Sequence, residues 1–468
     1  MKHNLPLTKF FVILSLLAFT LTSCNDDDDD SNNKNEEINS WIYNVMDQVY
    51  LWTTSMPSQD NVNTNADPSD FFESLLYSGD RFSVIYPDYE ELLNQLNGVT
   101  YEAGFEFQLL LLAQGSNEVV MVLLYVKPGS PADDAGLKRG DIITEINGNG
   151  ITTENYESVV PLIYEDFSAT YSSYNTSSEL YESKGSVNLA VEVIEENPNY
   201  MDTVYTINNS KIGYYVYNFF AQGSNGAYDN QMDDIIASFQ TEGINELVLD
   251  LRYNGGGSVN SAINMGSLIG SDVNSSKIFF SSIYNDLYQN YFESQPNPDE
   301  ELNTRFLDKA NNIGNQINHL YILVSGHTAS ASELIINGLD PYMDITIIGE
   351  TTVGKNVAST SIQDDENPDN NYGLLPIIAR LQNSQGYSDF ENGFTPLGDN
   401  YINEFDSPLT ELGDIHEILL RRAIELITGS NPNGRVAHRA KTFSYEKLPV
   451  SSIDRRPGTN RAILAQPE

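Results

Sequence analysis

The sequence has little cysteine and few basic residues, and each shortage excludes some classes of protein. It has 468 residues but a single cysteine, Cys24, so no disulfide can form within the chain and its stability must rest on packing. Lys and Arg together number 24 against 66 Asp and Glu, which gives a formal net charge of -42. Because nucleic acids bind basic surfaces, this balance argues against a nucleic-acid partner.

The apolar run at residues 10–21 is too short to cross a membrane, which takes about 20 apolar residues. This run follows Lys2 and Lys9 and precedes small residues, which is the order of an export signal over residues 1–23. The four residues that end at Cys24 resemble a lipobox, a resemblance that implies cleavage before Cys24 and a lipid on that cysteine. We therefore expect an exported lipoprotein held in the outer membrane through Cys24. The alternative is a plain signal peptide with an incidental cysteine.

Residues 24–37 predict an acidic linker, because the aspartates from Asp26 to Asp30 repel one another and stay solvated. This run serves as a spacer between anchor and folded body in one interpretation. In the other, it resembles the acidic tags that direct some Gram-negative lipoproteins to the outer face of the outer membrane.

Residues 38–98 predict a small N-terminal helical domain. Apolar residues recur at intervals of three and four from Ile38 to Trp52, the period of an amphipathic helix. A second helix is expected at about 69–76, after Asp67-Pro68, and a third at 92–96.

Residues 99–198 change in texture to strands, turns and one short helix. The segment 126–148 predicts a helix at about 131–135 that ends at Gly136, then a strand and a hairpin turn at Asn147-Gly148. Residues 164–185 have no clear pattern and predict a loop or a variable helix. The order of these features resembles a PDZ domain, which binds an extended peptide along a sheet edge. The resemblance places the carboxylate-binding loop at Gly104, Phe105 and Glu106, although a PDZ fold kept only as a structural module is the alternative.

Residues 199–429 alternate between strand and helix patterns, which predicts an α/β core around a mostly parallel sheet. Residues 430–468 carry Pro, Asn, Ser and basic residues without periodicity and predict a disordered tail. The fold class expected is thus multi-domain α/β.

Two segments of this core carry a candidate catalytic pair. Ser330 lies just after a predicted buried strand and just before a helix that starts at Ala331, and Lys355 follows the next strand. Both residues are therefore expected at the same edge of the sheet. A serine hydroxyl is a weak nucleophile, and a desolvated lysine that has lost its charge can take its proton. The alternatives are a helix-capping serine, a surface lysine, and a histidine base at His327.

The motif Thr-Ala-Ser-Ala-Ser-Glu around Ser330, followed by Gly-Glu-Thr-x-x-Gly-Lys ending at Lys355, resembles the signature of the carboxyl-terminal processing (tail-specific) serine peptidases. The resemblance implies a ClpP/crotonase-like core, Ser330 as nucleophile and Lys355 as base. It assigns the oxyanion hole to a glycine of the 255–257 turn, Gly256 by preference, together with the N–H of Ala331. Glu333 is expected to support the site or to cap its helix. Where many such enzymes have a glutamine, this chain has Ser359.

No cofactor or metal is expected, because the acidic residues of 364–370 lack the spacing of a calcium loop. The sequence therefore predicts a serine endopeptidase that cuts exported proteins or peptides. A surface peptide-binding lipoprotein that has lost turnover is the competing hypothesis.

Overall fold

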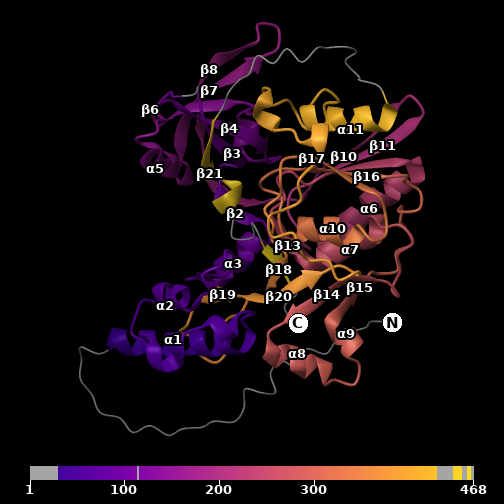
Figure 1. Ribbon diagram of the computed structural model, residues 1–468. Coiled ribbons are helices and arrows are strands. Elements are labelled where there is room, and N and C mark those ends of the chain that lie inside the picture. The colour runs from indigo at the N-terminus through magenta and orange to yellow at the C-terminus, as the bar shows by residue number, and fades with distance from the viewer. Residues whose placement is uncertain (1–29, 113–114, 430–445, 456–460, 465–468) are drawn as a thin grey trace.

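The computed structural model describes residues 30–112, 115–429, 446–455 and 461–464 (Figure 1). The predicted signal peptide, Cys24 and residues 24–29 of the linker lie outside the described residues. The rest of the linker is helical, because residues 30–37 form the first turns of α1 (Asp30–Val49). In the described part of the chain, no helix is both long and apolar enough to cross a membrane.

The N-terminal region is helical, as predicted. Its elements are α1, the short 3-10 helices η2 (Thr53–Ser55) and η3 (Gln59–Asn61), α2 (Pro68–Leu75), β1 (Val84–Tyr86) and α3 (Tyr89–Leu96). α2 begins where the Asp67 side chain accepts a hydrogen bond from the Ser69 amide and Pro68 occupies the first turn. β1 pairs antiparallel with β19 (Gly373–Leu375), so this region is joined to the core by a sheet.

The PDZ domain is built on strands that run β3-β4-β5-β7-β8 across one antiparallel sheet. Its elements are β2 (Val99–Glu102), β3 (Phe105–Leu111), β4 (Val119–Val126), α4 (Pro131–Asp134), β5 (Ile142–Ile146), β6 (Asn149–Gly150), α5 (Tyr156–Val159), η4 (Val160–Tyr164), β7 (Phe167–Asn175), β8 (Leu180–Leu189) and β9 (Glu192–Glu195). The prediction of a loop or helix at 164–185 is wrong, because β7 and β8 form a paired ribbon there.

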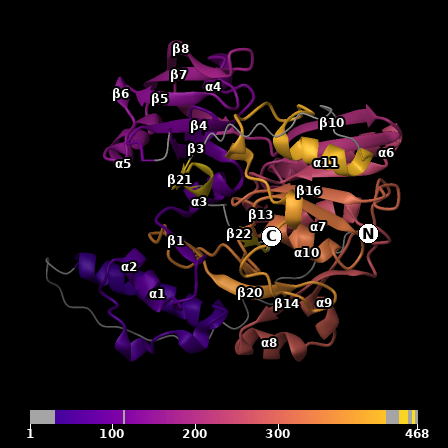
Figure 2. The same ribbon diagram turned by 45° about the horizontal axis from the view of Figure 1, so that its top comes forward.

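A five-stranded sheet forms the centre of the α/β core, and all but one of its strands are parallel, as predicted. In spatial order the strands are β10 (Asn199–Ile207), β11 (Ser210–Tyr217), β12 (Glu246–Asp250), β16 (Leu320–Val324) and β17 (Ile345–Gly349). One face packs on α6 (Ala227–Glu242), α7 (Val259–Ile269) and α10 (Ala331–Leu339), and the other on α11 (Ile418–Thr428) and the PDZ strands β3 and β4. Figure 2 shows α11 on the opposite side of β16 from α7 and α10.

A second sheet contains the segments that frame the candidate site. Its strands, in order, are β13 (Gly256–Ser258), β22 (Arg461–Ile463), β18 (Val357–Ser359), β20 (Ile377–Gln382), β14 (Ile278–Tyr284) and β15 (Asn303–Arg305). The remaining short helices are η5 (Ser224–Gly226), α8 (Asp286–Glu293), α9 (Pro298–Leu302), η6 (Gly398–Asn400) and η7 (Glu404–Asp406).

The tail is not disordered in its described parts, and that prediction is wrong there. β21 (Glu446–Ser451) adds to the PDZ sheet beside β3, η8 (Ile453–Arg455) follows it, and β22 enters the second sheet. The tail's ordering depends on pairing with strands distant in the sequence, which composition does not reveal.

Candidate active site

Ser330 lies in a strained turn between β16 and α10. Its backbone angles are φ 62° and ψ -111°, outside the regions that a side chain with a Cβ prefers. Such a turn between strand and helix is how nucleophilic serines are held at a sheet edge in enzymes of the α/β-hydrolase fold. The side chain is 1% exposed, and within the described residues its hydroxyl makes no well-formed hydrogen bond. The hydroxyl is thus held in place by the backbone and is available for another partner.

Glu333, one turn into α10, connects the serine turn to the lysine loop. Its Oε2 accepts hydrogen bonds from the backbone N–H groups of Ser330 and Lys355, both at 2.8 Å. Its Oε1 accepts from the Gly354 N–H at 2.7 Å and the Thr352 hydroxyl at 2.5 Å. Burial raises the pKa of this carboxyl above its usual range, against the lowering effect of these four donors. One buried carboxyl therefore fixes the separation of the two predicted catalytic residues.

Lys355 is buried under the N-terminal region. Its side chain is 2% exposed, and its Nζ lies 5.2 Å from the centre of the Phe82 ring. The neighbouring Arg81 donates a hydrogen bond of 3.0 Å to the carbonyl of Gly354. A lysine removed from water in this way has the environment in which lysines act as bases.

The glycine turn after β12 is organised by a fully buried side chain, Asn254. Its Oδ1 accepts from the Gly256 N–H at 2.9 Å, and its backbone carbonyl accepts from the Ala329 N–H at 3.2 Å and the Ser332 hydroxyl at 2.9 Å. The Gly256 N–H, expected in the oxyanion hole, is therefore already engaged.

Gly257 is the better placed of the two glycines. Phe220 pairs with the Gly256 carbonyl and the Ser258 N–H, both at 2.8 Å, so strand geometry directs the Gly257 N–H and C=O to the opposite side. Ala331 is the first residue of α10, where backbone N–H groups have no acceptor within the helix.

Sequence reasoning did not single out Thr352, Gly354, Asn254 or Phe82. The first two lie inside the motif that ends at Lys355, and Asn254 directly precedes the glycine turn, so proximity to a motif was an available signal. Phe82 had none, because it reaches Lys355 only through packing of the N-terminal region.

The predicted carboxylate-binding loop of the PDZ domain is engaged within the protein. The Gly104 carbonyl accepts from the Lys127 N–H at 2.8 Å, Phe105 is buried in the domain core, and Glu106 pairs with Lys127 at 3.0 Å. Glu106 also accepts a hydrogen bond from the hydroxyl of Ser452 in the tail. With an acidic side chain in the loop, a peptide carboxylate would meet like charge there.

His327 does not approach Ser330 as a base would in a serine–histidine pair. Its Nδ1 lies 3.0 Å from Oδ1 of Asp454, which belongs to the tail. In the described ranges, no group of three or more His, Cys, Asp or Glu side chains is arranged to hold a metal ion.

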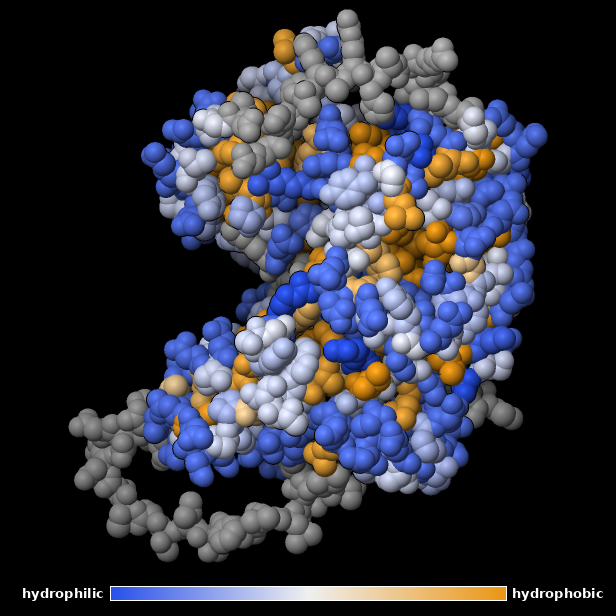
Figure 3. Space-filling model, in the orientation of Figure 1, coloured by the Kyte–Doolittle hydropathy of each residue, from blue (hydrophilic) through white to orange (hydrophobic). Residues whose placement is uncertain are grey.

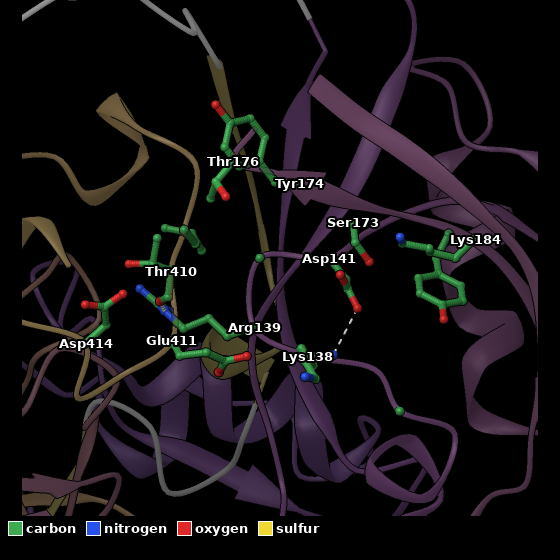
Figure 4. Close-up of a pocket in the computed structure, with 14 residues that line it drawn as sticks. Lys138, Arg139, Asp141, Ser173, Tyr174, Thr176, Lys184, Thr410, Glu411 and Asp414 are labelled. Atoms are coloured by element: carbon green, nitrogen blue, oxygen red, sulfur yellow. Dashed lines mark hydrogen bonds between the residues drawn. The ribbon is translucent and has the colours of Figure 1, made fainter. Parts of the chain in front are cut away.

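A pocket of about 500 Å³ lies between the PDZ domain and the segment 409–414 (Figure 4). It is lined by Arg139, Asp141, Lys184 and their neighbours, and contains none of the predicted site residues. The chemistry proposed for Ser330 therefore does not involve it.

The fold defines the class first: a multi-domain α/β protein in which a PDZ domain and a helical N-terminal region flank a mostly parallel sheet. Family models then match residues 211–396 as peptidase family S41, residues 37–84 as the peptidase S41 N-terminal domain and residues 122–169 as a PDZ domain. The chain belongs to peptidase family S41.

Known relatives agree with this family. The carboxy-terminal processing protease CtpA of Bacillus subtilis (strain 168) is 27% identical over 247 residues, 52% of this chain and 47% of the relative. A Staphylococcus aureus (strain COL) protein named "Probable CtpA-like serine protease" is 26% identical over 248 residues, 53% of this chain and 44% of the relative. The chain thus spans less than half the length of these relatives.

A solved structure extends the similarity over most of the chain. The crystal structure of a Bacteroides fragilis NCTC 9343 protein assigned to the S41 proteases is 26% identical, with a TM-score of 0.69, and covers 88% of this chain and 99% of that one. Because it covers 88% of the chain, this likeness extends beyond the core.

Proposed function

We propose that this protein is a serine endopeptidase of the carboxyl-terminal processing type, with Ser330 as nucleophile and Lys355 as base. The observation that carries the proposal is the shared carboxylate of Glu333, which accepts the backbone N–H of both residues. The backbone nitrogen atoms of Ser330 and Lys355 are therefore no farther apart than two hydrogen-bond lengths. Both side chains are buried.

The chemistry is acyl transfer. Neutral Lys355 accepts the hydroxyl proton of Ser330 as the serine oxygen attacks a peptide carbonyl, and the N–H groups of Gly257 and Ala331 donate to the oxyanion that forms. The protonated lysine then gives its proton to the departing amine, leaving an ester on Ser330. Water hydrolyses this ester by the same proton transfers and restores the free serine.

We propose exported proteins or peptides as the substrates, bound as an added strand at the PDZ edge beside β3. The export signal and the lipid on Cys24 remain predictions from the sequence, and on their basis we propose an enzyme anchored in the outer membrane. A Cys24→Ala protein is expected in the soluble fraction, and equal membrane association of both forms would contradict the anchor.

A serine-reactive fluorophosphonate probe tests the activity. We expect it to label the wild-type chain at Ser330 and not a Ser330→Ala variant, which should also hydrolyse peptides only at background rate. A folded chain that shows neither labelling nor hydrolysis, both with and without residues 446–468, would favour the second candidate, a peptide-binding lipoprotein that has lost turnover. The observation in favour of that candidate is that the tail strand β22 lies beside the glycine turn.

A further inference from the structure

The first part of the tail occupies the peptide-binding edge of the PDZ domain. β21 pairs antiparallel with β3, with Glu446 opposite Leu111 and Ser451 opposite Gln108. The Gln108 side chain donates to the carbonyls of Leu448 at 2.7 Å and Val450 at 3.0 Å. The side chains of Leu448 and Val450 pack on the apolar core of the domain. This is strand addition by a segment of the chain itself.

The residues that follow β21 hold this strand in place through hydrogen bonds and apolar packing. The Phe107 N–H donates to the Ser452 hydroxyl at 2.7 Å, and the Ser452 N–H donates to the Phe107 carbonyl at 3.1 Å. Ile453 is 1% exposed, in the apolar cluster that joins the PDZ strands to the central sheet and α11. Asp454 reaches the imidazole of His327, three residues before Ser330.

The second part of the tail fills the space between the glycine turn and the strand after Lys355. Figure 2 shows β22 beside β13. β22 is parallel to β13, with Ala462 opposite Gly257, and parallel to β18, with Ile463 opposite Ser359. The Leu464 N–H donates to the Ser359 carbonyl at 2.9 Å, and the Leu464 side chain packs on the apolar core. The helix that follows Ser330, α10, contacts both β13 and β22.

These two strands take positions that a peptide substrate would need. A peptide cleaved at Ser330 must place a carbonyl by the N–H of Gly257, on the side of that glycine where β22 now pairs. A peptide added at the PDZ edge must pair with β3, where β21 now pairs. Figure 3 shows the molecule hollowed between the PDZ domain and the N-terminal helices. β21 and β22 pair with strands of the protein itself, β3 and β13.

We propose that residues 446–455 and 461–464 are an intramolecular inhibitor, which must leave the β3 edge and the gap between β13 and β18 before a substrate can bind. The inference rests on the proposed function, because the tail is proposed to compete with peptide substrates for the site at Ser330. A tethered segment acts at an effective concentration of about millimolar, so a free peptide at micromolar concentration competes poorly with it.

The bound strand β21 also indicates which kind of ligand the PDZ edge accepts. The bound strand is internal, since the chain continues through Ser452 and Ile453, and it is held by backbone pairing and two apolar side chains. The substrates expected at this edge are extended segments with apolar residues at alternate positions, as in Leu448-Pro449-Val450.

A binding assay tests occupancy without relying on hydrolysis. The probe is a fluorescein-labelled synthetic peptide with the sequence of residues 446–464. Its anisotropy is titrated with two Ser330→Ala proteins, one of full length and one that lacks residues 446–468. We expect saturable binding to the shortened protein and binding at least tenfold weaker to the full-length one. Equal binding to both, or binding to neither when circular dichroism shows both folded, overturns the proposal.

Point variants in the full chain keep the test valid if the shortened protein does not fold. Leu448→Asp/Val450→Asp places charges against the PDZ core and should loosen β21, so the labelled peptide should bind this protein at least tenfold more tightly than the parent. Pro449→Asp is the matched control, because Pro449 lies between them and is exposed, and it should bind like the parent. No gain in the double variant, or the same gain in the control, overturns the proposal.

Hydrolysis by the same variants, with Ser330 intact, separates the two hypotheses. We expect kcat/KM on a fluorogenic peptide to rise at least tenfold in the double variant and the labelled peptide to inhibit it competitively. If the binding differences appear but no variant hydrolyses any peptide, the peptidase proposal fails while the occupancy stands. If wild type and double variant hydrolyse at equal rates, the inhibitor proposal fails and the peptidase proposal stands.

Discussion

The buried carboxylate of Glu404 lies where the PDZ domain meets the core, and its titration should be visible in the stability of the protein. It accepts hydrogen bonds from the Arg139 guanidinium of the PDZ domain at 2.9 Å and from the Tyr253 hydroxyl at 2.7 Å, and it lies 3.4 Å from the Arg252 guanidinium. Burial alone would raise the pKa of Glu404, but Arg139 and then Arg252 hold it at about 2, below its usual 4.5.

The size of the effect follows from this depression. Because each pKa unit corresponds to about 1.4 kcal/mol, the ionised form of Glu404 contributes about 3 kcal/mol to the free energy of unfolding. The folded-state pKa is the lower one, so this contribution is complete above pH 4.5 and is lost as the pH falls towards 2. A Glu404→Gln variant leaves two buried guanidinium groups short of a carboxylate, so at pH 7 we expect it to be less stable by about 3–5 kcal/mol.

Urea unfolding of the wild-type and Glu404→Gln proteins at intervals from pH 7 to pH 2 measures both effects. The stability difference between them should shrink by about 3 kcal/mol from pH 5 to pH 2. Glu90→Gln, on an exposed side chain of α3, is the matched control and should follow the wild type at every pH. A constant difference between wild type and Glu404→Gln across this range would refute the assignment of the ion pairs.

The remaining predictions concern the candidate site. Lys355→Arg keeps a positive charge but cannot accept a proton, so it should lose peptide hydrolysis as fully as Lys355→Ala, whereas His327→Ala should keep most of it, as measured by kcat/KM on one peptide. If Lys355→Arg were active and His327→Ala inactive, His327 and not Lys355 would be the base. Glu333→Gln replaces one accepting oxygen by an NH2 group, which cannot accept from the two donors that this oxygen serves. Each donor left unsatisfied should lower the free energy of unfolding by about 1–3 kcal/mol. We expect lower kcat with little change in KM and a lower urea midpoint; wild-type values for both would contradict its positioning role.

Local patterns predicted most of the core, because alternating strands and helices bury their apolar faces against near neighbours. The helix predicted to start at Ala331 is α10, and the strand predicted between that helix and Lys355 is β17. The ribbon of β7 and β8 was missed because β7 is mostly half-buried, β8 is mostly exposed and both are rich in polar residues. Apolar residues alternate only over a few positions at one end of the ribbon, where Phe167, Ala169 and Leu189 reach the core. β21 was missed for a different reason: its partner, β3, lies more than 300 residues earlier.

Within the candidate site, the motifs predicted the residues but not the hydrogen bonds among them. Ser330, Lys355 and Glu333 were predicted from two short segments, and the structure brings those segments together through the Glu333 carboxylate. The preference for Gly256 could not take account of a side chain two positions earlier, because Asn254 accepts the Gly256 N–H in the structure. A sequence shows which glycines can adopt such a turn, but the direction of each N–H depends on how the turn pairs with Phe220.

The surroundings of Lys355 are assembled from parts of the chain that are far apart in sequence. Phe82 of the N-terminal region lies over its amino group, Glu333 of α10 holds its backbone, and β18, which starts two residues later, pairs with the tail strand β22. Removing the tail would expose the edge of β18 without touching Phe82 or Glu333. Release of the tail would therefore open the edge of β18 to a peptide strand while the contacts of Lys355 with Phe82 and Glu333 remain. Access and catalytic geometry are then controlled by separate segments, so a variant of the tail should change the rate of hydrolysis without altering the hydrogen bonds that Glu333 makes to Ser330 and Lys355.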